Sequence, residues 1–356
     1  MGNPTGADLQ TLQHLLTCEG EEETILFRKA ANVRDTTIGN SVRLRGLIEI
    51  SNICHKDCLY CGIRKSNHTV RRYALTDKEI IDTALFAWEQ NFGSIVLQSG
   101  ERADPAFTVR IENLLKDIRK LTRGELGITL SLGEQETDTY KRWFESGAHR
   151  YLLRIETSNE DLYKKIHPSD ELHSFHTRLE CIEQLRKCGY QTGTGVMIGL
   201  PFQTTEDLVR DLLFFKTQDI DMVGMGPYLE HPSTPLYQYR HLLLPELERL
   251  RLSIHMVACL RLLMPNINIA ATTALQAIDP LGREKALAAG ANVMMPNITP
   301  QTGQSDYKLY PNKPCVKEGA LEAIRQLKES VKNYGCEIRM GEWGDSQHFH
   351  NRQRQD

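Results

Sequence analysis

Hydrophobic and polar residues follow two different rhythms along the chain. From residue 7 to residue 40, apolar residues recur three and four positions apart, which is typical of amphipathic helices. From Ser41 onward, short apolar runs rich in β-branched residues alternate with longer amphipathic segments. The short runs predict strands at 41–51, 94–99, 127–132, 150–156, 193–199, 221–227, 266–273 and 291–297. The longer segments predict helices at 77–91, 105–121, 136–146, 174–189, 204–217, 244–264, 281–289 and 317–334.

Eight strands, most of them followed by a helix, predict a closed (β/α)8 TIM barrel in the α/β class. The repeat occupies roughly 260 residues, which is the size of such a barrel. An open doubly wound sheet is the alternative, but the even spacing of the strands and the absence of a long inserted domain favour the barrel. We therefore expect an N-terminal helical lead-in at 1–40, a barrel at 41–340 and a flexible C-terminal tail at 341–356. In such a barrel, reactive groups lie at the carboxyl ends of the strands.

The composition is that of an ordinary globular protein and narrows the classes of function. The chain has 356 residues and a formal net charge of −3, which gives no reason to expect a surface for nucleic acid. No apolar stretch reaches the roughly 18 residues of a membrane span, and the amino end lacks the apolar core of a secretion signal. We therefore expect a cytoplasmic protein with no membrane partner. In a reducing cytosol, clustered thiols among its nine cysteines bind metal more often than they form disulfides.

Three of the cysteines, Cys54, Cys58 and Cys61, fall within eight residues, in the loop after the first predicted strand. Thiolates are soft ligands that suit zinc, copper(I) or iron–sulfur clusters. A structural zinc site needs a fourth ligand, for which His55 and His68 are the candidates. A [4Fe–4S] cluster held by three cysteines has one iron that is open to an exogenous ligand. Three thiols at this place in a barrel therefore indicate a reactive cluster, with zinc as the alternative.

Charged and hydroxyl residues follow several other predicted strands. Arg154 and Glu156 are two positions apart, so their side chains point the same way and together suit a zwitterionic amino acid. An ion pair between the two is the competing interpretation. Arg178 is a further candidate for binding a carboxylate, or else an exposed helical residue. Thr272 and Thr273 are adjacent hydroxyls that suit an anion, with helix capping as the competing role.

The string "CHKDCLYC" after the first strand of a barrel resembles the motif of the radical S-adenosylmethionine (SAM) enzymes. That resemblance implies that the three cysteines are catalytic and hold a [4Fe–4S] cluster, whose open iron chelates the amino and carboxylate groups of SAM. Reductive cleavage of SAM then gives methionine and a 5′-deoxyadenosyl radical. Tyr60 would lie beside the adenine. The remaining SAM contacts would come from Ser99, Gly100, Glu101, Arg154, Glu156 and Arg178.

Nearly the whole chain resembles one family of that superfamily, the [FeFe]-hydrogenase maturase HydE. The similar strings include "SNICHKDCLYCGIR", "IVLQSGE", "TLSLGE", "RYLLRIET", "MVGMGPYLEHPSTPL", "ATTA" and "GANVMMPN". The resemblance implies a closed internal cavity in which the radical acts on a small-molecule or organometallic precursor of the diiron subsite. It also implies other hydrogenase maturases and an electron donor as partners. Arg154 matches a SAM-contact position, and the positions that match the substrate cavity are Thr129, Thr272, Thr273, Met295 and Tyr307.

Three rival functions remain to be separated from hydrogenase maturation. A methylornithine synthase, which rearranges lysine by a radical mutase route, shares the general layout and is the main alternative. Biotin synthase needs a second cluster on strand-borne cysteines, and the predicted strands two to eight carry none. A zinc-binding protein or a carrier of an iron complex is the non-enzymatic alternative. Some HydE relatives hold a second cluster near the C-terminus, but Cys315 has no nearby cysteine, so we predict a single cluster.

Overall fold

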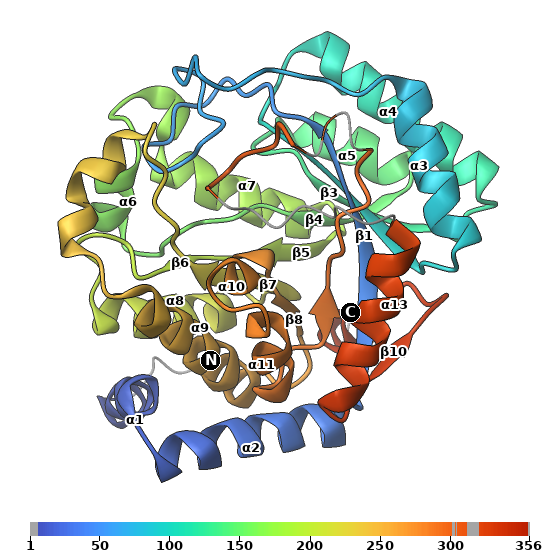
Figure 1. Ribbon diagram of the computed structural model, residues 1–356. Coiled ribbons are helices and arrows are strands. Elements are labelled where there is room, and N and C mark those ends of the chain that lie inside the picture. Colours follow the sequence, from blue (N-terminus) through green and yellow to red (C-terminus); the bar gives the residue numbers. More distant parts are fainter. Residues whose placement is uncertain (1–5, 301–302, 304, 312–319, 355–356) are drawn as a thin grey trace.

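The computed structural model describes residues 6–300, 303, 305–311 and 320–354, and its centre is a closed barrel of parallel strands (Figure 1). Each strand pairs with the next, and β9 pairs back onto β1, which closes the ring. The barrel strands are β1 Ser41–Ser51, β2 Ser94–Ser99, β3 Gly127–Ser131, β4 Ala148–Leu152, β5 Gln191–Thr194, β7 Met222–Pro227, β8 Asn268–Ala271 and β9 Val293–Met294. The two-residue strand β6, Met197–Ile198, follows β5 and pairs with β7. The predicted (β/α)8 barrel is therefore confirmed.

Helices surround the barrel, and several of them begin at a residue whose side chain caps the first turn. Thr76 accepts a hydrogen bond from the backbone of Glu79, and the Glu79 side chain accepts one in return. Asp104 caps the next helix, whose first residue is Pro105. The helices predicted between the strands are α3 Asp77–Glu89, α4 Pro105–Leu121, α5 Thr137–Glu145, α7 Phe175–Lys187, α8 Thr205–Thr217, α9 Glu246–Leu263 and α11 Gly282–Ala288, and α13 Ala320–Asn333 follows β9. The pattern did not predict α6 Glu160–Ile166, α10 Thr273–Ile278 or the 3-10 helices Glu171–His173 and Pro235–Leu242.

The N-terminal lead-in consists of two helices, α1 Gly6–Thr17 and α2 Glu21–Thr37, which pack against α9 (Figure 1). Arg251 of α9 donates to the carboxylates of Glu19 and Glu23 at 2.6 and 2.7 Å. His255, one turn further on, contacts the backbone oxygen of Leu16 at 2.9 Å. Because α1 and α2 cover α9 from outside, α9 is buried on more sides than a surface helix.

The expectation of a flexible tail from residue 341 is wrong for the part of it that the structure describes. The segment follows a short strand, β10 Glu337–Arg339, that pairs with β1, and it ends in helix α14, Gln347–Gln353. Between them, the Gly344 carbonyl accepts from Arg45 at 3.2 Å, and Asp345 pairs with Arg150 at 2.5 Å. Arg352 pairs with Asp221 at 2.7 Å. The segment is polar because it pairs with charged side chains of the barrel, and its polarity does not mean exposure to solvent.

Candidate active site

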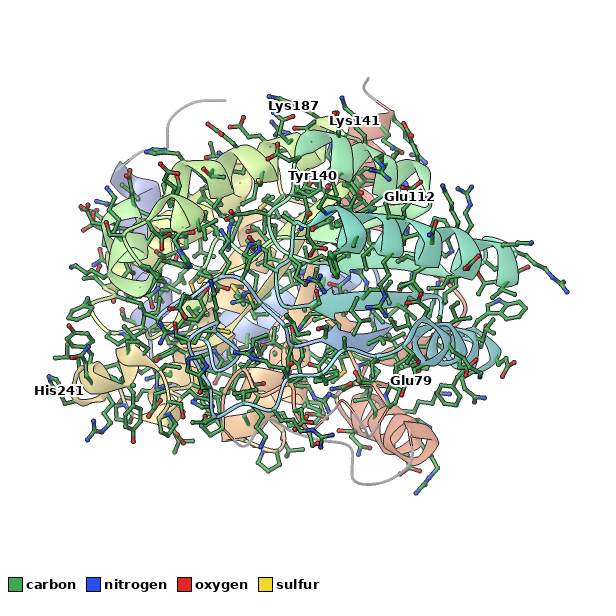
Figure 2. All side chains as sticks on the ribbon, turned by 90° about the horizontal axis from the view of Figure 1, so that it is seen from above. Glu79, Glu112, Tyr140, Lys141, Lys187 and His241 are labelled. Atoms are coloured by element: carbon green, nitrogen blue, oxygen red, sulfur yellow. The ribbon has the colours of Figure 1, made fainter. Side chains whose placement is uncertain are left out.

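A cavity of about 340 Å³ lies at the carboxyl ends of the strands and is lined by residues of several strand ends and their loops. Figure 2 looks down on the ring of helices from above and shows side chains filling its interior. Every predicted site residue except Thr129 lines this cavity. The strand ends thus bring together groups that lie up to about 250 residues apart in sequence, as a TIM barrel does for its active site.

The alternation of β1 places the cysteine loop over the cavity. Inward-facing side chains occur at every second position of a barrel strand. Arg45 therefore meets the C-terminal segment, whereas Leu47 and Glu49 line the cavity further along the same strand. The chain leaves β1 at Ser51 and immediately enters the loop with Cys54, Cys58 and Cys61, all three of which line the cavity.

The three thiols suit a metal cluster. Burial raises the pKa of the Cys54 thiol, raises that of Cys58 to about 12, and raises that of Cys61 well above its ordinary value. Thiols in such surroundings ionise when a metal supplies the compensating positive charge. No group of three or more His, Cys, Asp or Glu side chains among the described residues is arranged to hold a single metal ion. The three thiols, which line one cavity, fit a three-cysteine [4Fe–4S] cluster. Cys315 lies outside the described residues.

The end of β2 packs directly on the cysteine loop. A Cβ at Gly100 would lie 2.5 Å from the Ile53 carbonyl oxygen and 2.7 Å from the Cβ of Cys54, so this position requires glycine. The next residue, Glu101, donates its backbone N–H to the Cys54 sulfur at 3.3 Å. Gly100 and Glu101 thus pack directly against Cys54, and their predicted contact with SAM stays a prediction.

A buried network of charges holds the Glu101 carboxylate. His55 and Lys56 each lie 3.2 Å from its Oε1 atom, and Lys56 also donates to Glu134 at 2.7 Å. Burial raises the pKa of Glu101, but the hydrogen bond from His55 and the charges of Arg178 and Lys56 outweigh it and lower the pKa overall. Glu101 therefore stays ionised at neutral pH and can accept hydrogen bonds from a cationic group.

Arg178 is buried and lines the cavity, so the alternative of an exposed helical residue is wrong. Its guanidinium pairs with Glu134 and donates to the Arg154 carbonyl oxygen at 2.6 Å. Glu134 follows β3 and Lys56 lies inside the cysteine motif, and the sequence analysis singled out neither of them. Their positions could have identified them, because each follows a strand and Lys56 lies between two predicted cluster ligands.

Arg154 and Glu156 form the ion pair that was the competing interpretation, and both also line the cavity. The Arg154 Nε atom lies 3.0 Å from both carboxylate oxygens of Glu156. The other guanidinium nitrogens donate to the carbonyl oxygens of Gly224 and Val196 at 2.6 and 2.8 Å. Glu156 has a φ of 67°, a strained conformation for a residue with a side chain. β4 itself ends at Leu152, so the predicted strand 150–156 is too long, although Glu156 still forms an isolated parallel bridge with Val196.

Hydroxyl and aromatic side chains complete the cavity wall. Tyr60 contacts His167 at 3.3 Å, between its hydroxyl and the Nε2 atom. Thr272 precedes α10 but does not cap it; its hydroxyl donates to the Met225 carbonyl oxygen at 3.1 Å. The Thr273 hydroxyl lies 3.1 Å from that of Tyr310. Met295 and Tyr307 also line the cavity, together with residues that the sequence analysis did not propose, including Glu49, Gln98, Ser131, Met197 and Leu229.

Thr129 does not line the cavity, so its assignment to the substrate site is wrong. It lies in the middle of β3, where its hydroxyl accepts a hydrogen bond from the Arg150 Nε atom at 3.0 Å. Arg150 in turn pairs with Asp345 of the C-terminal segment. Ser131, two positions further along the same face of the strand, lines the cavity instead. The predicted position is therefore wrong by two residues along the same face of β3, a difference that similarity of short sequence strings does not resolve.

The fold, the three cavity thiols and a family comparison together define the class of protein. The model of the radical SAM superfamily matches residues 48–215, from the end of β1 to α8. Enzymes of this class use a [4Fe–4S] cluster and SAM. Over 311 residues the chain is 46% identical to the [FeFe] hydrogenase maturase subunit HydE of Thermotoga maritima, which covers 87% of this chain and 85% of that protein. The chain belongs to the HydE family of radical SAM enzymes.

More distant relatives share the same fold. The chain is 30% identical over 322 residues to the 3-methylornithine synthase of Methanosarcina acetivorans, covering 89% of this chain and 83% of that protein. A crystal structure of methylornithine synthase (PylB) has a TM-score of 0.78 at 25% identity over 94% of both chains. The maturase HydG from Carboxydothermus hydrogenoformans has a TM-score of 0.76 at 20% identity, over 93% of this chain and 76% of that one. No helix of the described residues is long and apolar enough to span a bilayer.

Proposed function

We propose that this chain cleaves SAM at a [4Fe–4S] cluster held by Cys54, Cys58 and Cys61 and directs the resulting radical to a precursor of the diiron subsite of [FeFe] hydrogenase. The observation that carries the proposal is the number and place of the thiols. Of the cysteines that the structure describes, these three line the cavity, and none of the others does. A cluster with three protein ligands keeps one iron for SAM, as this reaction requires.

The cofactors, when bound, supply a 5′-deoxyadenosyl radical, and the chain supplies their positions. The Glu101 carboxylate is held ionised beside the cysteine loop and would accept hydrogen bonds from the SAM ammonium group. Gly100 lets the backbone approach closely. Arg178 and the Arg154–Glu156 pair would meet the carboxylate and ribose ends of SAM. Tyr60 would lie along the adenine.

The lower part of the cavity would hold the substrate. Its wall combines hydroxyl donors with apolar groups, from Thr272, Thr273, Met295 and Tyr307. Hydroxyl groups can donate hydrogen bonds to the anionic ligands of a small iron complex, and the surrounding barrel excludes water from a radical reaction. Such a complex would come from another hydrogenase maturase. At least one other maturase would therefore act in the reaction step before this chain.

Rearrangement of lysine is the second candidate function. The Arg154–Glu156 pair at the cavity wall also suits the carboxylate and ammonium groups of an amino acid, and methylornithine synthase is a relative. Incubating the reduced, SAM-loaded chain with lysine separates the two. Formation of methylornithine would favour the mutase, whereas we expect no turnover of lysine.

In vitro maturation of an [FeFe] hydrogenase tests the main proposal. A reaction that contains the other maturases and this chain as the only source of the missing factor should yield active hydrogenase. Cys58→Ser removes one cluster ligand and should abolish maturation, whereas Cys188→Ser, at a half-buried cysteine of another region, should leave it near the parent level. Normal maturation with Cys58→Ser would contradict the proposed role.

A further inference from the structure

The segment that follows the cysteines carries only positive charges. Between Gly62 and Thr76 the chain has Arg64, Lys65, His68, Arg71 and Arg72 and no Asp or Glu, although the whole chain has a net charge of −3. We call residues 64–72 the basic loop. Lys65, His68 and Arg71 are exposed, whereas Arg64 and Arg72 are half-buried. This is a local concentration of cations next to the proposed cluster.

The basic loop is fixed to the cysteine loop. The backbone N–H of Lys65 donates to the carbonyl oxygen of Lys56, between the first two cysteines, at 2.9 Å. The Arg64 N–H donates to the carbonyl oxygen of Cys61 at 3.2 Å. The Arg72 guanidinium lies within hydrogen-bond distance of five backbone carbonyl oxygens, those of Asn52, Ile63, Arg64, Lys65 and Asn67. The exposed cations are therefore held at the outer side of the cluster ligands.

The charge of the basic loop is only partly neutralised. Arg64 pairs with Asp57 at 2.7 Å. Arg71 lies 3.8 Å from Asp306, and its side chain is 83% exposed, so that contact is weak. Lys308 is exposed next to Leu309, whose carbonyl oxygen accepts the Gly62 N–H at 3.0 Å. One apolar side chain, Ile53, is 38% exposed in the same loop region.

We propose that the basic loop is the docking surface for an acidic one-electron carrier protein. This inference rests on the proposed function, because reductive cleavage of SAM consumes one electron that the chain itself does not supply. In each encounter the carrier is oxidised by one electron and the cluster behind Cys54, Cys58 and Cys61 is reduced by one; no atom is transferred. Electron transfer slows steeply with distance, so the carrier must dock on the outer side of these ligands.

The character of the surface fits such a partner. Weak electron-transfer encounters use small interfaces, and opposite charges on the two partners raise the rate of association. Exposed cations on a loop that is held to the cysteine loop, with the exposed Ile53 in the same loop region, match a protein with an acidic rim around its redox centre. The backbone of the basic loop is held in place by hydrogen bonds to the cysteine loop.

A second basic area of the chain serves as the matched control. Lys116, Arg119, Lys120 and Arg123 surround a surface depression at the C-terminal end of α4. Because α4 runs antiparallel to the strands and is followed by β3, this distal patch lies at the amino ends of the strands, opposite the cluster. Glu145 also lines the depression, so its cations are partly neutralised as those of the basic loop are, and its place at the opposite end of the barrel excludes a role in reduction.

The test compares two double variants with the same change in charge, Lys65→Glu/Arg71→Glu and Lys120→Glu/Arg123→Glu. Formation of 5′-deoxyadenosine is measured against the concentration of an acidic bacterial ferredoxin that is kept reduced by NADPH and ferredoxin reductase. The basic-loop variant should raise the KM for ferredoxin about tenfold or more, and the parent KM should rise with salt. With reduced methyl viologen, a small cation, all three proteins should form the product at the same rate.

Binding of oxidised ferredoxin by isothermal titration calorimetry gives a second readout that does not depend on activity. The basic-loop variant should bind about tenfold more weakly than the parent, and the distal variant should bind equally well. Equal KM and affinity in the parent and the basic-loop variant would overturn the docking surface, as would an equal loss in the distal variant. A parent that forms no 5′-deoxyadenosine even with methyl viologen would instead contradict the proposed function.

Discussion

Replacing Gly133 with alanine should weaken SAM binding through the Glu101 carboxylate. Gly133 has a φ of 80°, and a Cβ there would overlap the Cγ, Cδ and Oε2 atoms of Glu101. The carboxylate cannot move away cheaply, since His55 and Lys56 hold it at 3.2 Å each. The variant therefore displaces the group that we propose to bind the SAM ammonium.

Two free-energy costs set the size of the effects expected in this variant. An alanine in the left-handed region costs about 1–2 kcal/mol of stability. Losing a hydrogen bond to a charged group costs about 1.5–3 kcal/mol, which corresponds to a roughly 10- to 150-fold weaker Kd for SAM. Gly124→Ala is the matched control, because Gly124 has a φ of 73° and open space where its Cβ would be.

Equilibrium dialysis of SAM against the anaerobically reconstituted proteins, together with thermal unfolding, separates the two effects. Both variants should lose stability, because both place alanine at a positive φ. Only Gly133→Ala should lose SAM affinity. Parent-like affinity in Gly133→Ala, or an equal loss of affinity in Gly124→Ala, would refute the role assigned to Glu101.

Three further outcomes concern the opposite end of the barrel. In urea titrations, Asp345→Asn should lower the free energy of unfolding by about 3 kcal/mol or more, because it leaves the charge of the fully buried Arg150 uncompensated. The control Asp82→Asn, in an exposed pair, should change the free energy of unfolding by less than about 0.5 kcal/mol. Burial raises the pKa of Asp345, but the hydrogen bond with His149 and the charge of Arg150 outweigh it and hold the pKa well below its ordinary value. Its contribution is therefore complete above about pH 4 and is lost as the pH falls further, so urea titrations from pH 7 to pH 3 should show a steeper acid loss in the parent than in Asp345→Asn. Thr129→Val should lower the free energy of unfolding but leave the rate of SAM cleavage at the parent level, since Thr129 does not line the cavity. A strong loss of SAM cleavage in this variant would show that Thr129 belongs to the site after all.

The barrel could be predicted from the sequence because its strands and helices carry strong local signals. β1, β2 and α4 have the bounds that the pattern predicted, Ser41–Ser51, Ser94–Ser99 and Pro105–Leu121. Parallel strands buried on both faces form short apolar runs, and Asp104 with Pro105 marks the start of a helix. The C-terminal segment was missed because its pattern of polar residues matches an exposed tail, and its partners are buried charges far away in the sequence.

The candidate site could be predicted where a motif carries it. The cysteines were found by their spacing, and the cavity positions mostly by resemblance. Lys56 and Glu134 were missed because their role depends on which loops meet above the barrel, which the sequence pattern does not specify. The Arg154–Glu156 pair was found, but the positive φ of Glu156 was not, since nothing in a string of alternating residues marks it.

The most direct test of the account is the product of SAM cleavage by the reconstituted chain. The protein is purified without oxygen, its iron and acid-labile sulfide are measured, and it is then reduced and incubated with SAM. We expect about four irons and four sulfides per chain, and equal amounts of methionine and 5′-deoxyadenosine. Cys58→Ser should yield neither product. One bound zinc per chain, or a full cluster that cleaves no SAM, would contradict the assignment of Cys54, Cys58 and Cys61.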